Sequence, residues 1–254
     1  MGVVNITPDS FSDGGRFLDS AAAVAHARRL AEEGADILDI GGESTRPGAK
    51  PVSGEEELER ILPVLRSLHD VPVSVDTRRP RVMGEALQAG ASMINDVDAL
   101  SAPGALDAVA GSNCAVCLMH KKGEPATMQQ DPRYQDVVRE VKDFLDRRVQ
   151  TTLAAGIAAE RIVVDPGFGF GKTAAHNFAL LKHLRELSEF PLLVGLSRKS
   201  TLGKITGRPV EERLAGSLAM ALLALQNGAS ILRVHDVKET KDVVAVWHAY
   251  ANDQ

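Results

Sequence analysis

The sequence has few aromatic residues and no long hydrophobic run. Aromatic residues make up only 4% of the 254 residues, whereas hydrophobic residues make up 44%, so aliphatic side chains must supply most of the core. No uninterrupted apolar run approaches the roughly 18 residues that a membrane span needs. The first residues, MGVVNITPDS, lack the basic and apolar segments of a signal peptide. We therefore expect a cytoplasmic protein with no membrane partner.

The sequence also lacks an excess of positive charge and has few cysteines. Its formal net charge is −5 and its pI is about 5.8, which makes nucleic acid an unfavourable partner. The two cysteines, Cys114 and Cys117, stand in the stretch CAVC. Residues three apart in a strand point to opposite faces, and no further ligands follow at metal spacing. We therefore interpret both cysteines as buried strand residues, not as a redox pair or half of a zinc site.

One pattern repeats along the chain. A short aliphatic run ends in a polar residue, a loop rich in glycine and proline follows, and an amphipathic stretch comes next. The runs show little alternation, which is typical of parallel strands covered on both faces. The eight predicted strands are residues 2–7, 36–42, 73–77, 93–97, 115–119, 162–166, 192–197 and 231–236.

The stretches between these runs predict helices. The clearest are residues 20–33, 53–65 and 209–227, and weaker patterns cover 135–155 and 240–250. Gly34 follows the first of them, as glycine often follows a helix. The second begins with Ser53-Gly54-Glu55-Glu56, which has the form of a capping box. Pro63 should kink that helix or end it early.

Eight strand-then-helix units in a chain of this length predict one α/β domain, residues 1–254, folded as a (β/α)₈ TIM barrel. The active site of such a barrel lies at the C-terminal mouth of the strands. An open doubly wound sheet is the alternative. That fold usually has fewer strands and concentrates its chemistry at one switch point. Here every predicted strand ends in a polar residue, which favours closure.

The predicted strand ends differ in charge. Asp39, Asp76 and Asp165 follow strands 2, 3 and 6, and basic residues follow strands 7 and 8. We therefore expect an acidic flank and a basic flank, and a ligand with a hydrogen-bond-donating heterocycle at one end and an anion at the other. The basic residues and the remaining polar strand ends are Arg198, Lys199, Arg233, His235, Asn5, Asn95, His120 and Ser197.

The stretch DPGFGFGKT, residues 165–173, ends like a nucleotide-binding P-loop. A P-loop would require glycine at position 166, where Pro166 stands, so the spacing fails. We interpret the glycines as allowing the backbone to approach a flat ligand, with Phe168 and Phe170 as apolar walls. Zinc hydrolysis is also disfavoured, because only His120 and His235 of the seven histidines lie at predicted strand ends. Magnesium leaves little sequence trace and stays open.

Seven segments, in order, resemble the dihydropteroate synthase family of pterin-binding barrels. The resemblance covers nearly the whole chain. It implies a transferase of folate biosynthesis, the target of sulfonamides, that condenses 6-hydroxymethyl-7,8-dihydropterin diphosphate with para-aminobenzoate to 7,8-dihydropteroate and releases diphosphate. It also implies Mg²⁺ and a homodimer. The segments are NITPDSFSDGG (5–15), DIGGESTRPGA (39–49), SVDT (74–77), INDV (94–97), DPGFGFGK (165–172), GLSRKS (195–200) and RVHDVKET (233–240).

The resemblance also implies roles for single residues. The pterin contacts it implies are Asp76, Asn95, Asp165 and Lys199. The diphosphate contacts are Asn5, Arg233 and His235, with Asn5 also at the metal. The para-aminobenzoate side comprises Thr45, Arg46, Pro47, Phe170 and Ser200. The catalytic group comprises Asp76, Lys199, Arg233 and His235. The loops at 7–15 and 43–50 correspond to a pair that closes over the site.

The implied chemistry needs no strong base, because an arylamine is already neutral at pH 7. The sequence accordingly shows no nucleophile–histidine pair, and we expect no acid–base pair of raised pKa. Asp98, Lys121 and Lys122 depart from the family, in which a basic residue and a more neutral pair are usual at these positions. We interpret His120 as structural.

Two alternatives remain at this point. A methyltetrahydrofolate-type methyltransferase barrel would share the acid-and-amide wall but would need neither a diphosphate site nor an aminobenzoate loop. The segments GGESTRPG and SRKS therefore argue against it. A catalytically silent pterin-binding homologue is the other alternative, because a loop displacement of about 1 Å can abolish turnover.

Overall fold

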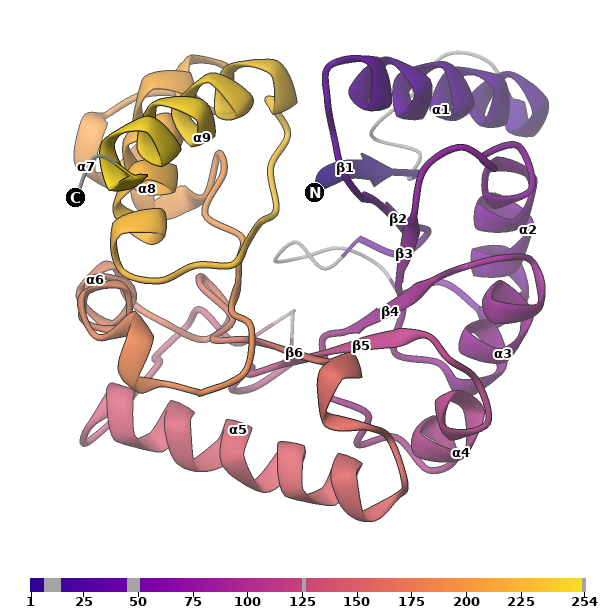
Figure 1. Cartoon of the computed structure of the whole chain (residues 1–254), viewed down its shortest axis with the longest axis horizontal. Helices are drawn as coiled ribbons and strands as arrows, with labels where there is room; N and C mark the ends of the chain where they lie inside the picture. The colour runs from indigo at the N-terminus through magenta and orange to yellow at the C-terminus, as the bar shows by residue number, and fades with distance from the viewer. Residues whose placement is uncertain (7–14, 45–50, 125–126, 253–254) are drawn as a thin grey trace.

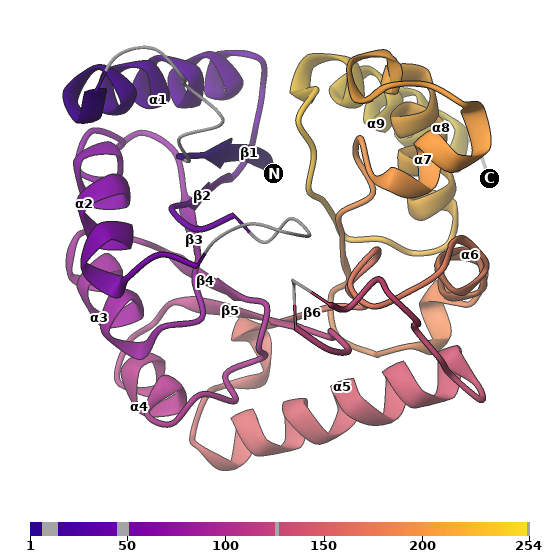
Figure 2. The same ribbon diagram turned by 180° about the vertical axis from the view of Figure 1, so that it is seen from behind.

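The protein is a closed barrel of parallel strands surrounded by helices (Figures 1 and 2). The computed structural model describes residues 1–6, 15–44, 51–124 and 127–252. The strands within these ranges are β1 (Gly2–Asn5), β2 (Leu38–Gly41), β3 (Val73–Asp76), β4 (Met93–Asp96), β5 (Ala115–Met119), β6 (Ile162–Asp165), β7 (Leu193–Val194) and β8 (Ile231–Leu232).

The order of the strands confirms the predicted barrel over the open sheet. Strands β1 to β6 pair in sequence order, and β7 pairs with β8. Single parallel bridges join Val164 to Leu192 and Gly2 to Val234, and these two bridges complete the ring. β7 and β8 are shorter than the predicted runs 192–197 and 231–236. The chain leaves regular pairing there and turns outward into the loops of the mouth.

Each of these strands is followed by at least one helix of the outer layer, and the helix after β4, α4, is short (Figure 1). The predicted helix at 209–227 is divided into a 3₁₀ turn at Val210–Glu212 and α8. The described helices are α1 (Gly15–Glu32), α2 (Gly54–Leu65), α3 (Pro80–Gln88), α4 (Ala105–Ala110), α5 (Val137–Ala154), α6 (Ala174–Lys182), α7 (Ser200–Thr206), α8 (Leu214–Gln226) and α9 (Val237–Asn252).

Local sequence signals explain where several helices begin and end. Gly34 adopts φ +96°, a left-handed conformation that favours glycine, and ends α1. Ser53 caps α2 by accepting a hydrogen bond from the Glu56 backbone N–H at 3.1 Å. α2 then ends two residues beyond Pro63. A reciprocal capping box forms at α6 instead, between Thr173 and His176.

The core has two layers, one outside the sheet and one inside the barrel. Cys114 belongs to the outer cluster and Cys117 to the inner one, so the two cysteines face opposite sides as predicted. Both are free thiols. Met93, Cys117 and Val163 belong to the apolar inner layer. Because side chains alternate along a strand, the residue two positions after Met93 or Val163 also points inward, one layer nearer the mouth.

None of the helices in the described ranges is long and apolar enough to cross a membrane.

Candidate active site

Arg233 lies at the centre of the barrel mouth and bridges two carboxylates. Its Nε donates to Asp39 Oδ2 at 2.6 Å, and its Nη2 donates to Asp76 Oδ2 at 3.1 Å. Asn95 Nδ2 donates to the same Asp39 oxygen at 3.3 Å. Side chains from β2, β3, β4 and the end of β8 therefore meet inside one ring. The period of two along each strand places them there, directly above the apolar inner layer.

Two carboxyl groups at this mouth, those of Asp76 and Asp165, have raised pKa values. Burial raises the pKa of Asp76 well above its usual range, and the neighbouring Asp39 adds to this while the Arg233 cation opposes it. Burial also raises the pKa of Asp165, against the Gly167 N–H that donates to its Oδ1 at 2.7 Å. The expectation of no acid–base pair of raised pKa did not anticipate that single buried carboxyls would have raised pKa values. The sequence locates a carboxylate, but only the closed barrel removes it from water.

The expected basic flank does not form as an array of cations. Arg233 reaches across to the acids, and Arg198 pairs with Asp236, with Nε and Oδ2 3.0 Å apart. The Nδ1 atom of His235 lies 3.1 Å from Ser197 Oγ, and burial lowers the pKa of His235 to about 4, so the ring is neutral at pH 7. A buried cation without a partner is costly, which explains why Arg233 pairs with the carboxylates nearest to it.

Lys199 and Phe170 form the other wall of the mouth. The ammonium Nζ of Lys199 lies 4.5 Å from the centroid of the Phe170 ring. The Lys199 charge also lowers the pKa of Asp165, which places the amine near that carboxyl. Phe168 differs from the expectation, because it is 1% exposed and belongs to the outer core. Only the second phenylalanine of the GFGF stretch therefore faces this wall.

Gly167 and Gly171 of the GFGFGK loop make room for the backbone of a neighbouring loop, and this is a different reason from the predicted approach to a ligand. Gly167 and Gly171 adopt φ +68° and +64°. A Cβ on Gly167 would lie 1.8 Å from the His120 carbonyl oxygen, and one on Gly171 would lie 2.1 Å from the Lys122 carbonyl oxygen. The loops after β5 and β6 are thus pressed together. His120 is 5% exposed and packs edge-on against Phe144, as its structural interpretation requires.

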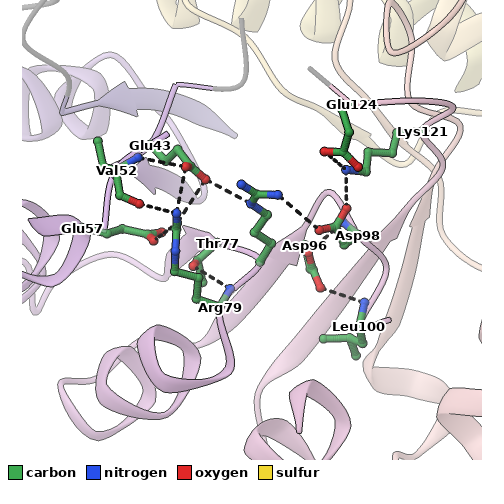
Figure 3. A network of polar contacts seen from close by, with 11 residues as sticks. Glu43, Val52, Glu57, Thr77, Arg79, Asp96, Asp98, Leu100, Lys121 and Glu124 are labelled. Carbon is green, nitrogen blue, oxygen red and sulfur yellow. Dashed lines mark hydrogen bonds and ion pairs between the residues drawn. The ribbon is translucent and has the colours of Figure 1, made fainter. Parts of the chain in front are cut away.

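A polar network lies beside the mouth, next to β2 and β3, and the sequence analysis did not predict it (Figure 3). Arg79 pairs with both oxygens of Glu43, at 2.9 and 3.1 Å, and with the fully buried Glu57. It also donates to the Val52 carbonyl, and the Val52 N–H donates to Glu43 at 3.3 Å. We call Arg79, Glu43, Glu57 and Val52 the Arg79 clamp. The doublet Arg78-Arg79, directly after SVDT, is the signal that could have found it.

The departures from the family contact one another in this network. Lys121 Nζ lies 2.6 Å from Asp98 Oδ1, and Arg78 reaches Asp98 at 4.0 Å and Glu43 at 3.2 Å (Figure 3). Lys122 contacts Glu140 on α5 at 3.2 Å. Asp98 and Lys121 therefore compensate each other's charge across the loops after β4 and β5.

The structure brings together the four residues implied for the pterin, Asp76, Asn95, Asp165 and Lys199, at the same end of the barrel. Ser200 is the exposed first residue of α7, next to Lys199. Thr45, Arg46 and Pro47 lie outside the described residues, as do most of the two implied loops, residues 7–14 and 45–50.

The donor set at the mouth suits magnesium better than zinc. The described ranges contain no group of three or more His, Cys, Asp or Glu residues that could hold a metal ion. Asn5 Oδ1 and Asp76 Oδ2 flank Gly41, each 3.9 Å from the point where a Cβ on that glycine would lie. Mg²⁺ takes few protein oxygens and completes its shell with water and phosphate. A single amide oxygen fits it when a phosphate ligand is also bound.

Comparison with known proteins gives consistent matches over the whole chain. The profile of the pterin binding enzyme family matches residues 1–235. Dihydropteroate synthase of Escherichia coli (strain K12) is 50% identical over 254 residues, covering 98% of this chain and 90% of that protein.

Solved structures agree. Xanthomonas albilineans dihydropteroate synthase with 4-aminobenzoic acid superposes with a TM-score of 0.93 at 55% identity, covering 99% of this chain and 92% of that one. The same enzyme in complex with 7,8-dihydropteroate gives a TM-score of 0.90 at 53% identity, with the same coverage.

Proposed function

The chain belongs to the family of pterin-binding enzymes, and on that premise we infer that it catalyses the dihydropteroate synthase reaction. It condenses 6-hydroxymethyl-7,8-dihydropterin diphosphate with para-aminobenzoate, and it releases diphosphate and 7,8-dihydropteroate. The observation that carries this inference is the ring of Asp76, Asn95, Asp165 and Lys199 at one barrel mouth. Relatives of known structure hold 4-aminobenzoic acid, which is one substrate of this reaction, and 7,8-dihydropteroate, which is its product, and both complexes support the proposal.

The pterin ring is proposed to bind against the acids and the amide. A pterin presents ring N–H and exocyclic NH₂ donors, and ionised carboxylates are acceptors only. Asp76 and Asp165 would accept from these donors, and Asn95 can both donate and accept. Lys199 would lie along the ring, opposite the carboxylates. The apolar inner layer below the ring limits how deeply it can enter the barrel.

The diphosphate end is proposed to lie between Asn5, Arg233 and His235. When bound, Mg²⁺ would neutralise charge that gathers on the diphosphate oxygens, and Asn5 is the residue that would hold it. Arg233 can turn part of its guanidinium toward the phosphates while Asp39 keeps its Nε. His235 is neutral and would donate a single hydrogen bond.

Bond exchange takes place at the methylene carbon of the pterin. The C–O bond breaks, and the diphosphate leaves with its electron pair. The carbon becomes cation-like, and the surrounding carboxylates stabilise that charge. The amine nitrogen of para-aminobenzoate then forms the C–N bond and loses one proton to solvent. Phe170 and Ser200, with Thr45, Arg46 and Pro47, are proposed to hold the aminobenzoate ring.

Two further proposals concern the whole protein. We propose a cytoplasmic location, supported by the two free, buried thiols of Cys114 and Cys117. We also propose a homodimer. Its support is that all six large hydrophobic side chains with high exposure in the described ranges lie between Ile205 and Tyr250.

A turnover assay tests the function. The protein is given dihydropterin diphosphate, Mg²⁺ and para-aminobenzoate, and both diphosphate and dihydropteroate are measured. We expect both products in equal amounts. A methyltransferase barrel would release neither and would use methyltetrahydrofolate instead. A silent homologue would bind the pterin without turnover, and that result would refute the proposed function.

A further inference from the structure

The side chain of Lys172 is buried beside the site, and the proposed reaction gives it no task. It is 2% exposed. Its Nζ lies 2.9 Å from His120 Nδ1, 2.9 Å from the Gly167 carbonyl oxygen and 3.1 Å from the Phe170 carbonyl oxygen. An ammonium has three protons to donate, so these three acceptors satisfy it. A lysine is almost never buried so completely unless it is paired, so this arrangement needs an explanation.

The acceptor at His120 fixes the protonation of the pair. Burial lowers the pKa of His120 to about 3, and the Lys172 charge adds to this. The ring is therefore neutral, and its Nδ1 can accept a hydrogen bond from the Lys172 ammonium. Burial also lowers the pKa of Lys172 to about 7, while the Asp165 charge opposes this. The carbonyl partners nevertheless favour the cation, because a carbonyl can only accept.

The partners of Lys172 belong to the two loops that meet at the site. Gly167 and Phe170 lie in the loop between β6 and α6, and His120 begins the loop after β5. The same β6–α6 loop is held at one end by the Gly167 N–H on Asp165 Oδ1. It is held in the middle by the Gly169 N–H on Asn177 Oδ1 at 3.0 Å. Lys172 is the cation in these described contacts, and it joins the Gly167 and Phe170 carbonyls to His120 at the start of the loop after β5.

This loop carries groups for both substrates of the proposed reaction. Asp165, whose carboxylate is oriented by the Gly167 N–H, is on the pterin side. Phe170, whose ring lies under Lys199, is on the para-aminobenzoate side. A rotation of either peptide that bonds Lys172 would therefore move one of these groups.

We propose that Lys172 is a positioning residue: its buried ammonium ties the Gly167 and Phe170 carbonyls to His120 and so holds the β6–α6 loop in the conformation that presents Asp165 and Phe170 to the two substrates. This inference rests on the proposed function. The role differs from that of the lysine in a nucleotide-binding P-loop, which the Gly-Lys-Thr sequence around Lys172 resembles. The lysine is turned inward to its own loop, and its donors are already used.

The test replaces the cation with an apolar side chain of similar length, Lys172→Met. The matched control is Lys182→Met, at an exposed lysine on α6. We measure kcat and the KM of each substrate. The loop carries binding contacts, so we expect KM to rise about tenfold or more for at least one substrate, while kcat changes by less than about threefold. A purely structural role would lower the active fraction and hence kcat, and would leave both KM values unchanged.

Unchanged KM values in Lys172→Met, whatever its kcat, overturn the inference. If that variant does not fold, His120→Leu provides the second test, because it removes one acceptor and leaves the carbonyl partners; it should raise KM in the same direction by a smaller factor. An unchanged KM there overturns the inference as well. A wild-type protein without turnover refutes the proposed function itself and this inference with it. The two failures are therefore distinguishable.

Discussion

Arg233 connects the two ends of the site, the carboxylates that would hold the pterin and the side chains that would hold the diphosphate. The sequence places it with the basic residues after strands 7 and 8, and from that placement it should serve chiefly the diphosphate end. Its contacts with Asp39 and Asp76 give it a second task, since it pairs with both carboxylates and its charge opposes the burial that raises the pKa of Asp76. Removing the cation should therefore weaken the binding of both the pterin and the diphosphate ends of the substrate.

We predict that Arg233→Met weakens binding of the free pterin, which carries no phosphate, and moves its pH dependence. The Arg233 charge lowers the pKa of Asp76 against burial, so its loss raises that pKa further. A protonated Asp76 presents an O–H donor at one of its two oxygens, so it matches two ligand donors less well than the carboxylate does. The affinity for the pterin should then fall most at low pH, and the midpoint of its pH dependence should move to higher pH. Titration calorimetry between about pH 6 and about pH 8.5 measures the affinity for the free pterin at each pH. A tenfold loss of affinity corresponds to about 1.4 kcal/mol of binding free energy.

The matched control for this prediction is Arg139→Met, because the Arg139 side chain on α5 is 80% exposed and pairs with Asp143 at 3.8 Å. It should leave the pH profile unchanged. A loss of affinity confined to the diphosphate form of the pterin would contradict the second task of Arg233.

We also predict that Asp165→Asn weakens pterin binding by about tenfold or more, because a hydrogen bond to a charged group contributes about 1.5–3 kcal/mol. The asparagine can still accept from the Gly167 N–H, so the loop should keep its shape. Its NH₂ group, however, opposes a ligand donor. Fluorescence titration with the free pterin gives the affinity. An affinity equal to that of the wild type would remove Asp165 from the pterin contacts.

At the scale of single elements, the Arg79 clamp joins the two ends of the segment between β2 and α2. Glu43 follows β2 and Val52 precedes α2, and Arg79 binds both. It is also the partner of Glu57, a fully buried carboxyl whose pKa burial raises and Arg79 lowers. Removing this arginine leaves a buried acid without its cation.

We predict that Arg79→Met lowers the free energy of unfolding by about 3 kcal/mol at neutral pH, as breaking a buried ion pair does. The cost should shrink toward pH 5. Glu57 has a raised pKa in the folded state, so its ionisation destabilises the protein as pH rises through that pKa, and protonation removes the cost. Urea denaturation at several pH values measures it.

Arg81→Met is the control for this prediction, because Arg81 lies in α3 close to Arg79 in the sequence, is 66% exposed and only approaches Glu85 at 3.9 Å. Its loss should cost less than about 1 kcal/mol. The double variant Arg79→Met with Glu57→Gln should recover part of the stability. Equal losses in Arg79→Met and Arg81→Met would show that the clamp is not a buried pair.

The elements themselves follow from the sequence more readily than the contacts do. Aliphatic runs bounded by glycine and proline predicted all eight strands, because burial on both faces demands such runs. The short helices α3, α4 and α7 have few residues in which a period could appear. The clamp was missed for a different reason. Glu43, Glu57 and Arg79 are isolated charges in sequence, and only folding makes them neighbours.

At the scale of the whole molecule, barrel closure creates the chemistry. Asp39 and Arg233 are 194 positions apart, yet they share a hydrogen bond of 2.6 Å. The sequence predicted which side chains meet at the mouth, because the carboxyl ends of parallel strands share one rim. It could not predict how their charges pair, since this depends on side-chain reach and on how much water the ring excludes. The raised carboxyl pKa values and the central position of Arg233 are both features that the sequence could not predict.

The same scale gives a prediction about assembly. Helices α7, α8 and α9 lie together at one corner of the barrel (Figures 1 and 2). Leu223 on α8 is 40% exposed, and Val246 on α9 is 67% exposed. Apolar side chains gathered on one face usually mark a surface that another protein covers. We therefore predict that this face forms the proposed homodimer, and that Leu223→Glu converts the dimer to a monomer.

Sedimentation velocity measures this conversion. The control is Gln150→Glu, which adds the same charge at an exposed position on α5, away from this corner (Figure 1). It should sediment as the wild type does. The glutamate at position 223 would have to lose its hydration inside an apolar contact, which costs several kcal/mol for an unpaired charge. A dimer that persists in both Leu223→Glu and Val246→Glu would place the interface elsewhere, and a monomeric wild type would refute the homodimer itself.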